Sequence, residues 1–341
     1  MTRTYKGGQI LITIAIDAMG GDNAPNAIVQ GVNLALHTYE DVKVKLYGDE
    51  SLILPLLDAN DRVEVIHTTD VITGEDEPVI AVRRKKTASM VLAAKAVKDG
   101  EADVVLSAGN TGALLASGLL VVGRIKNIDR PGLMPVIPTI SKEHPQFILM
   151  DAGANADAKP VNLHQHAILA NYYAREVLEI NQPRVGLINN GTEAGKGNEV
   201  SKAAHDLLET EEQLNFVGNI EARDLLNGVV DIAITDGFTG NAVLKTLEGT
   251  SKSVLKAIKD ALLNSGLKTK LGALLVKGAL AQLKDDFDDS KAGGAVMLGV
   301  KGIVIKAHGS ANEEAIFNAI RQARKVAQSG VIEKTIQFFE N

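Results

Sequence analysis

Short runs of β-branched and aliphatic residues alternate with helical stretches along almost the whole chain, and this alternation constrains the fold more than any other feature. Near-continuous apolar strands between helices are typical of a mainly parallel sheet that helices cover on both faces. We therefore predict an α/β fold, a three-layer α/β/α sandwich. The expected strands lie near 12–17, 42–48, 63–67, 103–107, 133–140, 146–151, 184–189, 214–218, 230–235 and 302–307. The expected helices lie near 25–37, 88–99, 111–122, 162–179, 198–209, 240–264, 270–284 and 311–328.

Nothing in the sequence marks a division into two domains. Residues 129–145 hold four of the 9 prolines, which predicts an extended segment or a hairpin at the edge of a sheet. We expect a single domain over residues 10–341, preceded by a flexible leader over residues 1–9. The apolar stretch "ILITIAI" is too short for a signal peptide and is followed by Asp17.

Composition excludes several classes of chemistry. The chain has no Cys, so thiolate nucleophiles, thiolate metal sites and disulfides are excluded. The formal net charge of -6 and the absence of Trp disfavour a nucleic-acid partner. The sequence shows no H-E-x-x-H zinc motif and no G-x-S-x-G nucleophile motif, so we expect neither a metal nor another cofactor. His164 and His166 are two residues apart, and we expect them to be surface or capping residues.

Six loops that follow predicted strands have a similar composition. Each is rich in Gly and carries Asn, Asp or Thr, and most lead into a helix. The carboxyl ends of parallel strands lie at one rim of a sheet, and helix starts there offer free N–H groups to an anion. A single such loop is explained equally well by helix capping, but the set predicts a shared anion-binding rim. The loops are "DAMGGDNAP" (17–25), "SAGNTGALL" (107–115), "DAGANAD" (151–157), "NNGTEAGKG" (189–197), "TDGFTGNA" (235–242) and "AHGSAN" (307–312).

The loop at 189–197 contains the strongest single candidate for binding an anion, Lys196. The loop is not a P-loop, because Gly191 and Gly195 bracket three residues rather than four, and Gly197 follows the lysine. No G-x-G-x-x-G dinucleotide fingerprint occurs anywhere in the chain. Lys245 and Lys306 are further cations near the predicted rim.

Three other features carry charge or a titratable group near this rim. His308 closes a predicted strand, where it is either a functional group or a capping residue. The run Arg83, Arg84, Lys85 and Lys86 is either a solvated face or a site for phosphate or an acidic partner. Residues 252–284 carry seven Lys against one acid, with Lys270, Lys277 and Lys284 repeating every seven residues. We predict that this stretch forms a projecting helical hairpin, which is either a dimer interface or core pair, or a basic amphipathic contact with a membrane or an acidic partner.

Longer motifs occur along the chain: "IAIDAMGGDNAP" (14–25), "KTASM" (86–90), "SAGNTGALL", "DRPGL" (129–133), "MDAGAN" (150–155), "GLINNGTEAGKGNE" (186–199), "GNIEARDLL" (218–226), "TDGFTGNAVLKTLEG" (235–249) and "GVKGIVIKAHGSAN" (299–312). From about residue 12 to beyond 325, these motifs resemble the PlsX family of bacterial phosphate acyltransferases.

The resemblance implies transfer of a fatty acyl group from acyl carrier protein to inorganic phosphate. The acyl phosphate would pass to a membrane glycerol-3-phosphate acyltransferase for phospholipid synthesis. It also implies a homodimer, a cytoplasmic location with peripheral membrane contact, and a Rossmann-like fold similar to phosphotransacetylases and isocitrate/isopropylmalate-type dehydrogenases. The carrier protein or the membrane would then meet the run 83–86 or the hairpin lysines.

Our mechanistic hypothesis is direct attack of bound phosphate on the thioester. Backbone N–H groups and Asn side chains would stabilise the oxyanion, Lys196 would neutralise phosphate charge, and His308 would protonate the departing thiolate. Asp17 and Asp236 would orient partners or cap helices, and Asn241 completes the expected catalytic group. The expected phosphate-binding residues are Gly20, Gly21, Asp22, Asn110, Thr111, Asn190, Gly191 and Thr192. The alternatives are a nicotinamide-dependent dehydrogenase on a similar fold and a non-catalytic membrane-attached scaffold.

Overall fold

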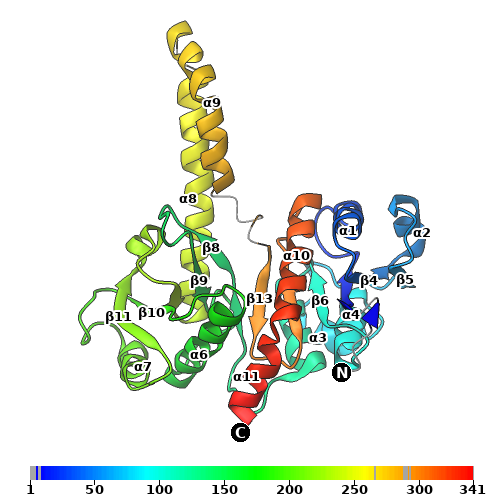
Figure 1. The fold of residues 1–341 in the computed structure, drawn as a ribbon, viewed down its shortest axis with the longest axis horizontal. Coiled ribbons are helices and arrows are strands. Elements are labelled where there is room, and N and C mark those ends of the chain that lie inside the picture. The colour runs from blue at the N-terminus through cyan, green and yellow to red at the C-terminus, as the bar shows by residue number, and fades with distance from the viewer. Residues whose placement is uncertain (1–4, 7–8, 265, 287–290, 292, 341) are drawn as a thin grey trace.

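The computed structural model describes residues 5–6, 9–264, 266–286, 291 and 293–340. Its first element is a short antiparallel hairpin of β1 (Tyr5–Lys6) and β2 (Gln9–Ile10). The rest of the expected leader lies outside the described residues. Two larger sheets follow, and each forms one half of the molecule. One pair of long helices projects from the molecule (Figure 1).

A seven-stranded sheet forms one half, with strand order β5-β4-β3-β6-β14-β13-β7. Its strands are β3 (Ile12–Asp17), β4 (Val42–Gly48), β5 (Val63–His67), β6 (Val104–Ser107), β7 (Gly132–Met134), β13 (Ala295–Leu298) and β14 (Ile303–Lys306). Only β13 runs against its neighbours β14 and β7, and the others are parallel. The apolar runs of β3 and β6 are almost wholly buried, as a sheet covered on both faces requires.

Helices cover both faces of this sheet. The helices α1 (Asn26–Thr38) and α10 (Glu313–Ser329) pack together on one face. On the other face lie α4 (Ser89–Lys98), α5 (Thr111–Ser117) and the π-helical turn η2 (Gly118–Gly123), with α3 (Pro78–Arg84) against α5. The short turns α2 (Glu50–Ile53) and η1 (Leu54–Leu56) precede β5.

A five-stranded sheet forms the other half, with strand order β11-β10-β12-β9-β8. Its strands are β8 (Val136–Pro138), β9 (Gln146–Met150), β10 (Arg184–Asn189), β11 (Asn215–Glu221) and β12 (Ile232–Ile234). Only β8, at the edge, is antiparallel, so the edge hairpin expected from the prolines is confirmed. The helices α6 (Pro160–Glu176) and α7 (Glu199–Glu209) lie on this sheet, η3 (Ala222–Asn227) follows β11, and α8 (Gly237–Leu263) contacts β9.

The chain passes between the sheets at Pro135, where one predicted strand over 133–140 is divided into β7 and β8. Proline cannot donate a ladder hydrogen bond, which favours a break at this point. The two halves still share one buried apolar cluster, which includes Ile14 of the first sheet and Ile148 of the second. A hydrogen bond from Gln322 Nε2 of α10 to the Tyr173 hydroxyl of α6, 3.3 Å long, also joins them. The α/β class is confirmed, but with two sheets in place of one.

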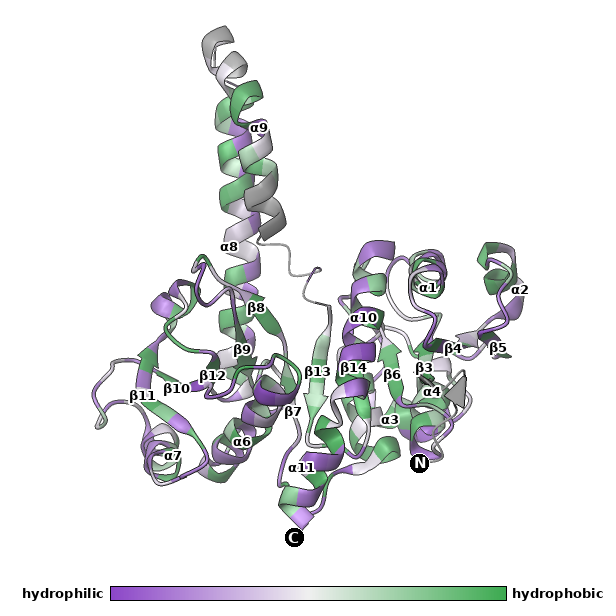
Figure 2. Cartoon of the chain, viewed as in Figure 1, coloured by the Kyte–Doolittle hydropathy of each residue, from purple (hydrophilic) through white to green (hydrophobic). Residues whose placement is uncertain are grey.

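The predicted projecting hairpin is confirmed: α8 and α9 (Leu267–Asp286) lie against each other and extend away from both sheets (Figure 1). Apolar stretches occur along the exposed length of both helices (Figure 2). Among the described side chains, Leu274 and Leu275 are 68% and 89% exposed, and Lys277 is exposed. The side chains of Lys270 and Lys284 lie outside the described part. No helix in the described ranges is both long and apolar enough to span a membrane.

Three of the longer elements were not predicted from the sequence: α3, β13 and the last helix, α11 (Val331–Glu340). The short elements β1, β2, α2, η1 and η3 were not predicted either. The last helix packs on α6, beyond Gly330, whose φ of 68° ends α10 in a left-handed cap.

Candidate functional site

Two loops at the carboxyl ends of β3 and β14 are tied together through their backbones. The Asp22 N–H donates to the Gly309 carbonyl oxygen at 2.8 Å. The side-chain Nδ2 of Asn23 also donates to the carbonyl oxygens of Ser310 and Ala311, at 3.2 and 3.1 Å. The loops 17–25 and 307–312 therefore form one unit, although nearly 300 residues separate them in sequence (|i−j| = 287 for Asn23 and Ser310).

A buried carboxylate joins the loop after β6 to the same unit. Asp17, at the end of β3, accepts hydrogen bonds from the hydroxyls of Ser89 and Ser107 at 2.6 and 2.7 Å. The Ser107 oxygen in turn accepts from the Gly109 N–H at 2.9 Å. Burial raises the pKa of Asp17, against the lowering effect of these hydrogen bonds. Asp17 thus organises the loops from beneath and does not reach solvent.

Glycines allow these loops to pack this closely. A Cβ on Gly20 would lie 2.4 Å from Asp17 Oδ2 and 2.8 Å from the Gly109 backbone nitrogen. Gly21 has a φ of +104°, and a Cβ there would lie 3.0 Å from the Gly309 oxygen. Both positions require glycine for the contact between loops, whether or not a ligand also approaches them.

Lys306, the last residue of β14, supplies a cation to this unit. Its Nζ donates to the Ala108 oxygen at 3.1 Å and to the Ala307 oxygen. Burial, and then repulsion from Lys245, lower the pKa of Lys306 to about 8, although Asp17 and Asp22 oppose the shift. The sequence placed Lys306 near the rim but did not single it out.

His308 follows this lysine by two residues and is exposed. Its Nδ1 accepts a hydrogen bond from the Ser310 N–H at 3.2 Å and lies 2.9 Å from the Ser310 hydroxyl. Because Nδ1 acts as an acceptor, the neutral ring carries its proton on Nε2. Nε2 has no hydrogen-bond partner within the described part of the chain. The imidazole is therefore oriented and has a free N–H.

The loops after β9 and β12 form a second unit in the five-stranded sheet. The buried Asp151 carboxylate accepts from the backbone N–H groups of Gly153, Ala154 and Asn155 at 3.1, 2.9 and 2.8 Å. The Gly237 N–H donates to the Asn155 oxygen at 2.8 Å. This unit fixes the start of α8 against the loop 151–157.

Two predicted catalytic residues lie at the start of α8. Asp236 caps the helix, accepting from the Thr239 N–H at 2.8 Å and from its hydroxyl at 2.9 Å. Its carboxylate is thus engaged as a cap, one of the two roles expected for it. Asn241 is exposed and lies against Gly153, whose built Cβ would be 3.5 Å from the Asn241 Oδ1.

The loop 189–197 follows β10, in the same sheet as the second unit. Within the loop, Asn189 Nδ2 donates to the Lys196 oxygen at 3.1 Å, and Asn219 Nδ2 of β11 donates to the Glu193 oxygen at 2.8 Å. Among the described residues, no hydrogen bond or ion pair joins it to another strand-end loop. The six loops therefore lie at the carboxyl edges of two sheets, three at each edge, because β10, β12 and β9 are parallel neighbours in one sheet and β3, β6 and β14 in the other. That these loops bind an anion together stays a prediction. Lys196, Asn190 and Thr192 are exposed, Gly191 is half-buried, and their roles stay predictions.

In the loop before α5 and in the basic run 83–86, one predicted site residue each already makes structural hydrogen bonds. Asn110 caps α5 by accepting from the Ala113 N–H at 3.0 Å and donates to the Thr73 oxygen at 3.1 Å, while Thr111 is exposed. The Lys85 Nζ donates to Asp76 Oδ2 at 2.8 Å, and this hydrogen bond lowers the pKa of Asp76 to about 2.

The other three cations of the basic run remain exposed: Arg83, Arg84 and Lys86. The Lys86 Nζ donates to the Val82 oxygen at 3.2 Å. A charged surface at the end of α3 is therefore available, without Lys85.

The paired histidines of α6 correct an expectation. His164 lies 3.0 Å from Glu211 Oε2, near the surface, but His166 is fully buried, with Nε2 3.0 Å from the Arg130 oxygen. Burial lowers the pKa of His166, so the ring is neutral and structural. In the described parts of the chain, no three His, Asp or Glu side chains are placed to hold a metal ion together.

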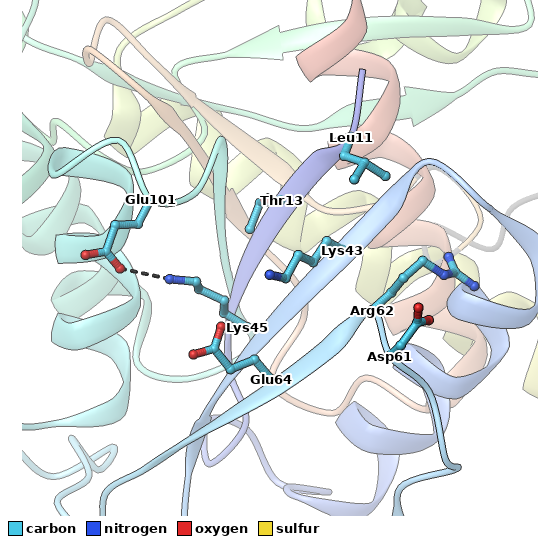
Figure 3. A pocket seen from close by; sticks show the side chains of 8 residues that line it. All are labelled: Leu11, Thr13, Lys43, Lys45, Asp61, Arg62, Glu64 and Glu101. Carbon is cyan, nitrogen blue, oxygen red and sulfur yellow. Dashed lines mark hydrogen bonds and ion pairs between the residues drawn. The ribbon is translucent and has the colours of Figure 1, made fainter. Parts of the chain in front are cut away.

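A hollow of about 420 Å³ lies at the opposite, amino ends of β3, β4 and β5 (Figure 3). It contains both signs of charge, and the Lys45 Nζ is paired with Glu101 Oε2 at 2.8 Å. Its distance from the strand-end loops separates it from the candidate site. Its lining residues are Leu11, Thr13, Lys43, Lys45, Asp61, Arg62, Glu64 and Glu101.

Solved structures place the chain in a class of two-sheet α/β enzyme folds. A branched-chain phosphotransacylase from Enterococcus faecalis superposes with a TM-score of 0.62 at 18% identity, covering 93% of this chain and 99% of that one. A phosphotransacetylase from Streptococcus pyogenes gives a TM-score of 0.62 at 13% identity, covering 93% and 94%. A 4-hydroxythreonine-4-phosphate dehydrogenase from Klebsiella pneumoniae gives 0.51 at 13%, covering 93% and 99%. At these identities the likeness shows the fold alone.

Sequence comparison then identifies the family. Residues 12–334 match the model of the fatty acid synthesis protein family, to which this chain belongs. Proteins named phosphate acyltransferase from Streptococcus pneumoniae and Streptococcus mutans are each 55% identical to it, over 96% of this chain and 98% of theirs. The predicted resemblance is confirmed, and the chain is an acyltransferase.

Proposed function

We propose that this acyltransferase moves a long-chain fatty acyl group from acyl carrier protein to inorganic phosphate. A phosphate oxygen attacks the thioester carbonyl carbon, the C–S bond breaks, and the products are acyl phosphate and the free carrier thiol. The names of the 55% identical relatives and of the family support this reaction.

The observation that carries the proposal is the cation of the first loop unit. The Lys306 Nζ donates to two carbonyl oxygens, and the ring of His308, two residues further along the chain, is oriented by the Ser310 N–H. Phosphate, largely dianionic at neutral pH with a second pKa of roughly 6 by analogy with phospho-residues, needs positioning more than deprotonation. A site with a fixed cation suits an acceptor that brings its own nucleophilic oxygen.

His308 is placed to assist the leaving group in this scheme. Its free Nε2–H donates a hydrogen bond to the departing thiolate, whose pKa of roughly 8.5 already makes it a fair leaving group. The thiolate becomes the free thiol by taking up the proton that the attacking hydrogen phosphate gives up. Backbone N–H groups of the loops and the amide of Asn241 stabilise the oxyanion in the proposed mechanism.

A covalent route through Ser310 is the main competing mechanism, because its hydroxyl lies 2.9 Å from His308 Nδ1. In that route Ser310 takes the acyl group before phosphate does. Direct attack predicts that Ser310→Ala keeps most of the turnover, because alanine retains the backbone N–H that orients the ring.

The deciding experiment incubates the purified protein with palmitoyl-acyl carrier protein, with and without inorganic phosphate. Free carrier thiol and acyl phosphate are both quantified, for the wild type and for Ser310→Ala. We expect phosphate-dependent thiol release with a matching amount of acyl phosphate in both proteins. Release without phosphate would identify a thioesterase, and an intact lipid or carrier interaction without release would favour a scaffold. Loss of activity in Ser310→Ala, with an acyl-enzyme in the wild type, would replace direct attack by the covalent route.

The partners that the family resemblance implies are part of the same proposal. We place a homodimer contact or a peripheral membrane contact on the hairpin of α8 and α9, supported by the exposed Leu274 and Leu275. Acyl carrier protein docks on the exposed cations of 83–86 or on the hairpin lysines. Acyl phosphate passes to a membrane glycerol-3-phosphate acyltransferase, with this protein on the cytoplasmic side. Sedimentation velocity and flotation with anionic vesicles measure the first two contacts, and a monomer that never floats would contradict them.

A further inference from the structure

The short helix α3 exposes apolar and basic side chains on the same side. Its other side, Ala81 and Val82, is buried in the seven-stranded half of the molecule. Because residues three and four apart are neighbours on a helix surface, the exposed side brings an apolar pair next to a basic pair. The apolar pair is 41% and 50% exposed. We call these four residues the α3 face: Val79, Ile80, Arg83 and Arg84.

The positive charge of the α3 face is not neutralised within the described part of the chain. There, neither the Arg83 nor the Arg84 guanidinium has a hydrogen-bond or ion-pair partner. Two acids that precede the helix are already engaged. Asp76 accepts from the Lys85 Nζ at 2.8 Å, and the Glu77 carboxylate caps α3 by accepting from two backbone N–H groups at 3.4 and 2.7 Å. An acidic partner would therefore complement this face.

The α3 face starts beside one of the strand-end loops. Asn110 Nδ2, in the loop after β6, donates to the Thr73 and Asp76 oxygens at 3.1 and 3.4 Å, in the segment that leads into α3. A Cβ on Gly112 would lie 2.7 Å from Pro78 Cγ, so α3 and α5 touch at their first turns. The loop after β6 also shares the buried carboxylate at the end of β3. A protein bound to α3 is thus held beside the carboxyl edge of the seven-stranded sheet.

We propose that the α3 face docks an acidic protein surface, and that in the proposed reaction this surface belongs to the acyl carrier protein. The inference rests on the proposed function, and it selects α3 over the hairpin lysines as the place where the acyl donor binds. Apolar side chains bordered by arginine are typical of protein interfaces. A membrane is a poorer match, because this helix of 7 residues is about 10 Å long and offers only two large apolar side chains for insertion.

The test compares variants of the α3 face with the wild type in the kinetics of acyl phosphate formation, varying palmitoyl-acyl carrier protein and inorganic phosphate separately. The double variant Arg83→Glu, Arg84→Glu reverses the charge of the face. Ile80→Ser removes apolar area and leaves the charge unchanged. The matched control is the double variant Lys142→Glu, Lys202→Glu, which reverses two exposed cations of the five-stranded half.

We expect the double arginine variant to raise the KM for the carrier roughly 10- to 100-fold at low salt, because interface charges steer association. Ile80→Ser should raise it roughly three- to tenfold, through lost apolar burial. The KM for phosphate, and kcat at saturating carrier, stay within about twofold, because the lost contact is ground-state binding of the carrier. The arginine effect shrinks above about 0.15 M salt, where the Debye length is about 8 Å, whereas the Ile80→Ser effect does not. The control behaves as the wild type.

A second measurement needs no turnover. Fluorescence anisotropy of labelled acyl carrier protein, titrated with each variant, gives the affinity directly, and urea unfolding shows whether each variant is folded. Ile80→Ser changes an exposed side chain, so it keeps the test decisive if the double arginine variant does not fold.

Each outcome has one meaning. If the wild type forms acyl phosphate but the α3 variants keep its carrier KM and affinity, the docking assignment is wrong and the proposed function stands. If Lys277→Glu in the hairpin weakens carrier binding and the α3 variants do not, the carrier docks on the hairpin and the inference is overturned. If the α3 variants lose only flotation with anionic vesicles, the face contacts a membrane, which also overturns it. If the wild type binds no carrier and forms no acyl phosphate, the proposed function itself fails.

Discussion

The loop after β14 and the loop after β10 are both glycine-rich and both adjoin a lysine, but the structure builds them differently. The first is tied to the loop after β3 by one backbone hydrogen bond and two from the Asn23 side chain, and its lysine is held by two carbonyl oxygens. Among the described residues, the hydrogen bonds of the second lie within the loop or come from the neighbouring strand β11, and its lysine is exposed. Composition is therefore a poor guide to which polar loop belongs to a site. Attachment to other loops distinguishes the two.

The largest difference between the two loops is expected when a glycine near each is replaced by alanine. Gly20→Ala forces a Cβ into the Gly109 backbone nitrogen at 2.8 Å, whereas Gly195→Ala meets no atom within 4 Å. We expect Gly20→Ala to lower the free energy of unfolding by roughly 1–3 kcal/mol and to reduce turnover at least tenfold. The matched variant Gly195→Ala should stay within about 0.5 kcal/mol. Urea unfolding and the acyl phosphate assay measure both, and equal behaviour would remove the distinction.

The next effect is the pH dependence of phosphate binding. Lys306 has its pKa lowered to about 8, with Lys245, Asp17 and Asp22 as the charged groups that act on it. Phosphate prefers the charged lysine, so the KM for phosphate should rise up to about tenfold per pH unit above 8.

Loss of the same proton from Lys306 affects folding stability in the opposite direction: phosphate binding weakens as the pH rises, whereas folding stability increases. Between about 8 and 10.5 the unfolded chain keeps this proton while the folded chain loses it, so this group makes stability rise with pH. Both trends should vanish in Lys306→Met. A phosphate KM that stays flat to pH 9.5 in the wild type would contradict the assignment.

The smallest effect is expected in the loop after β10. If only a loop that is hydrogen-bonded to other strand-end loops binds phosphate, Lys196→Ala raises the KM for phosphate less than threefold and leaves kcat unchanged, because an exposed charge is screened by solvent. The sequence prediction that Lys196 neutralises phosphate charge requires a much larger change. The same kinetic series as for Lys306→Met decides between them.

Much of the fold could be predicted from local patterns. Strands such as β3 and β6 are apolar runs that only a buried position explains. The strand β13 escaped because its four residues lie between Gly294 and Gly299, and antiparallel pairing with β14 and β7 defines it. For α3 the signal was present: Pro78 follows Glu77, whose side chain accepts from the Val79 and Ile80 N–H groups. The helix was not predicted because its sequence is a short run of aliphatic and basic residues.

The site was less accessible to prediction than the fold. The sequence analysis selected His308 because it follows an apolar strand and precedes a glycine. Lys306 had a comparable signal, because it is a cation at the end of the same apolar strand. How the loops of the two sheets lie relative to one another depends on the core that the sheets share, which no local pattern encodes. The choice of Lys196 followed loop composition, which does not reveal whether a loop is attached to its neighbours.

The helix α8 runs without interruption from the loop unit at Asp236 to the turn into α9. At 1.5 Å per residue, its 27 residues span about 40 Å. It therefore works as a lever with a short arm at Lys245 and a long arm at the tip. A tilt of about 3° about its capped base displaces the tip by roughly 2 Å, by the geometry of a rod of that length. The orientation of the hairpin and the position of Lys245 are thus one mechanical variable, and a surface that holds the tip also sets where that lysine stands.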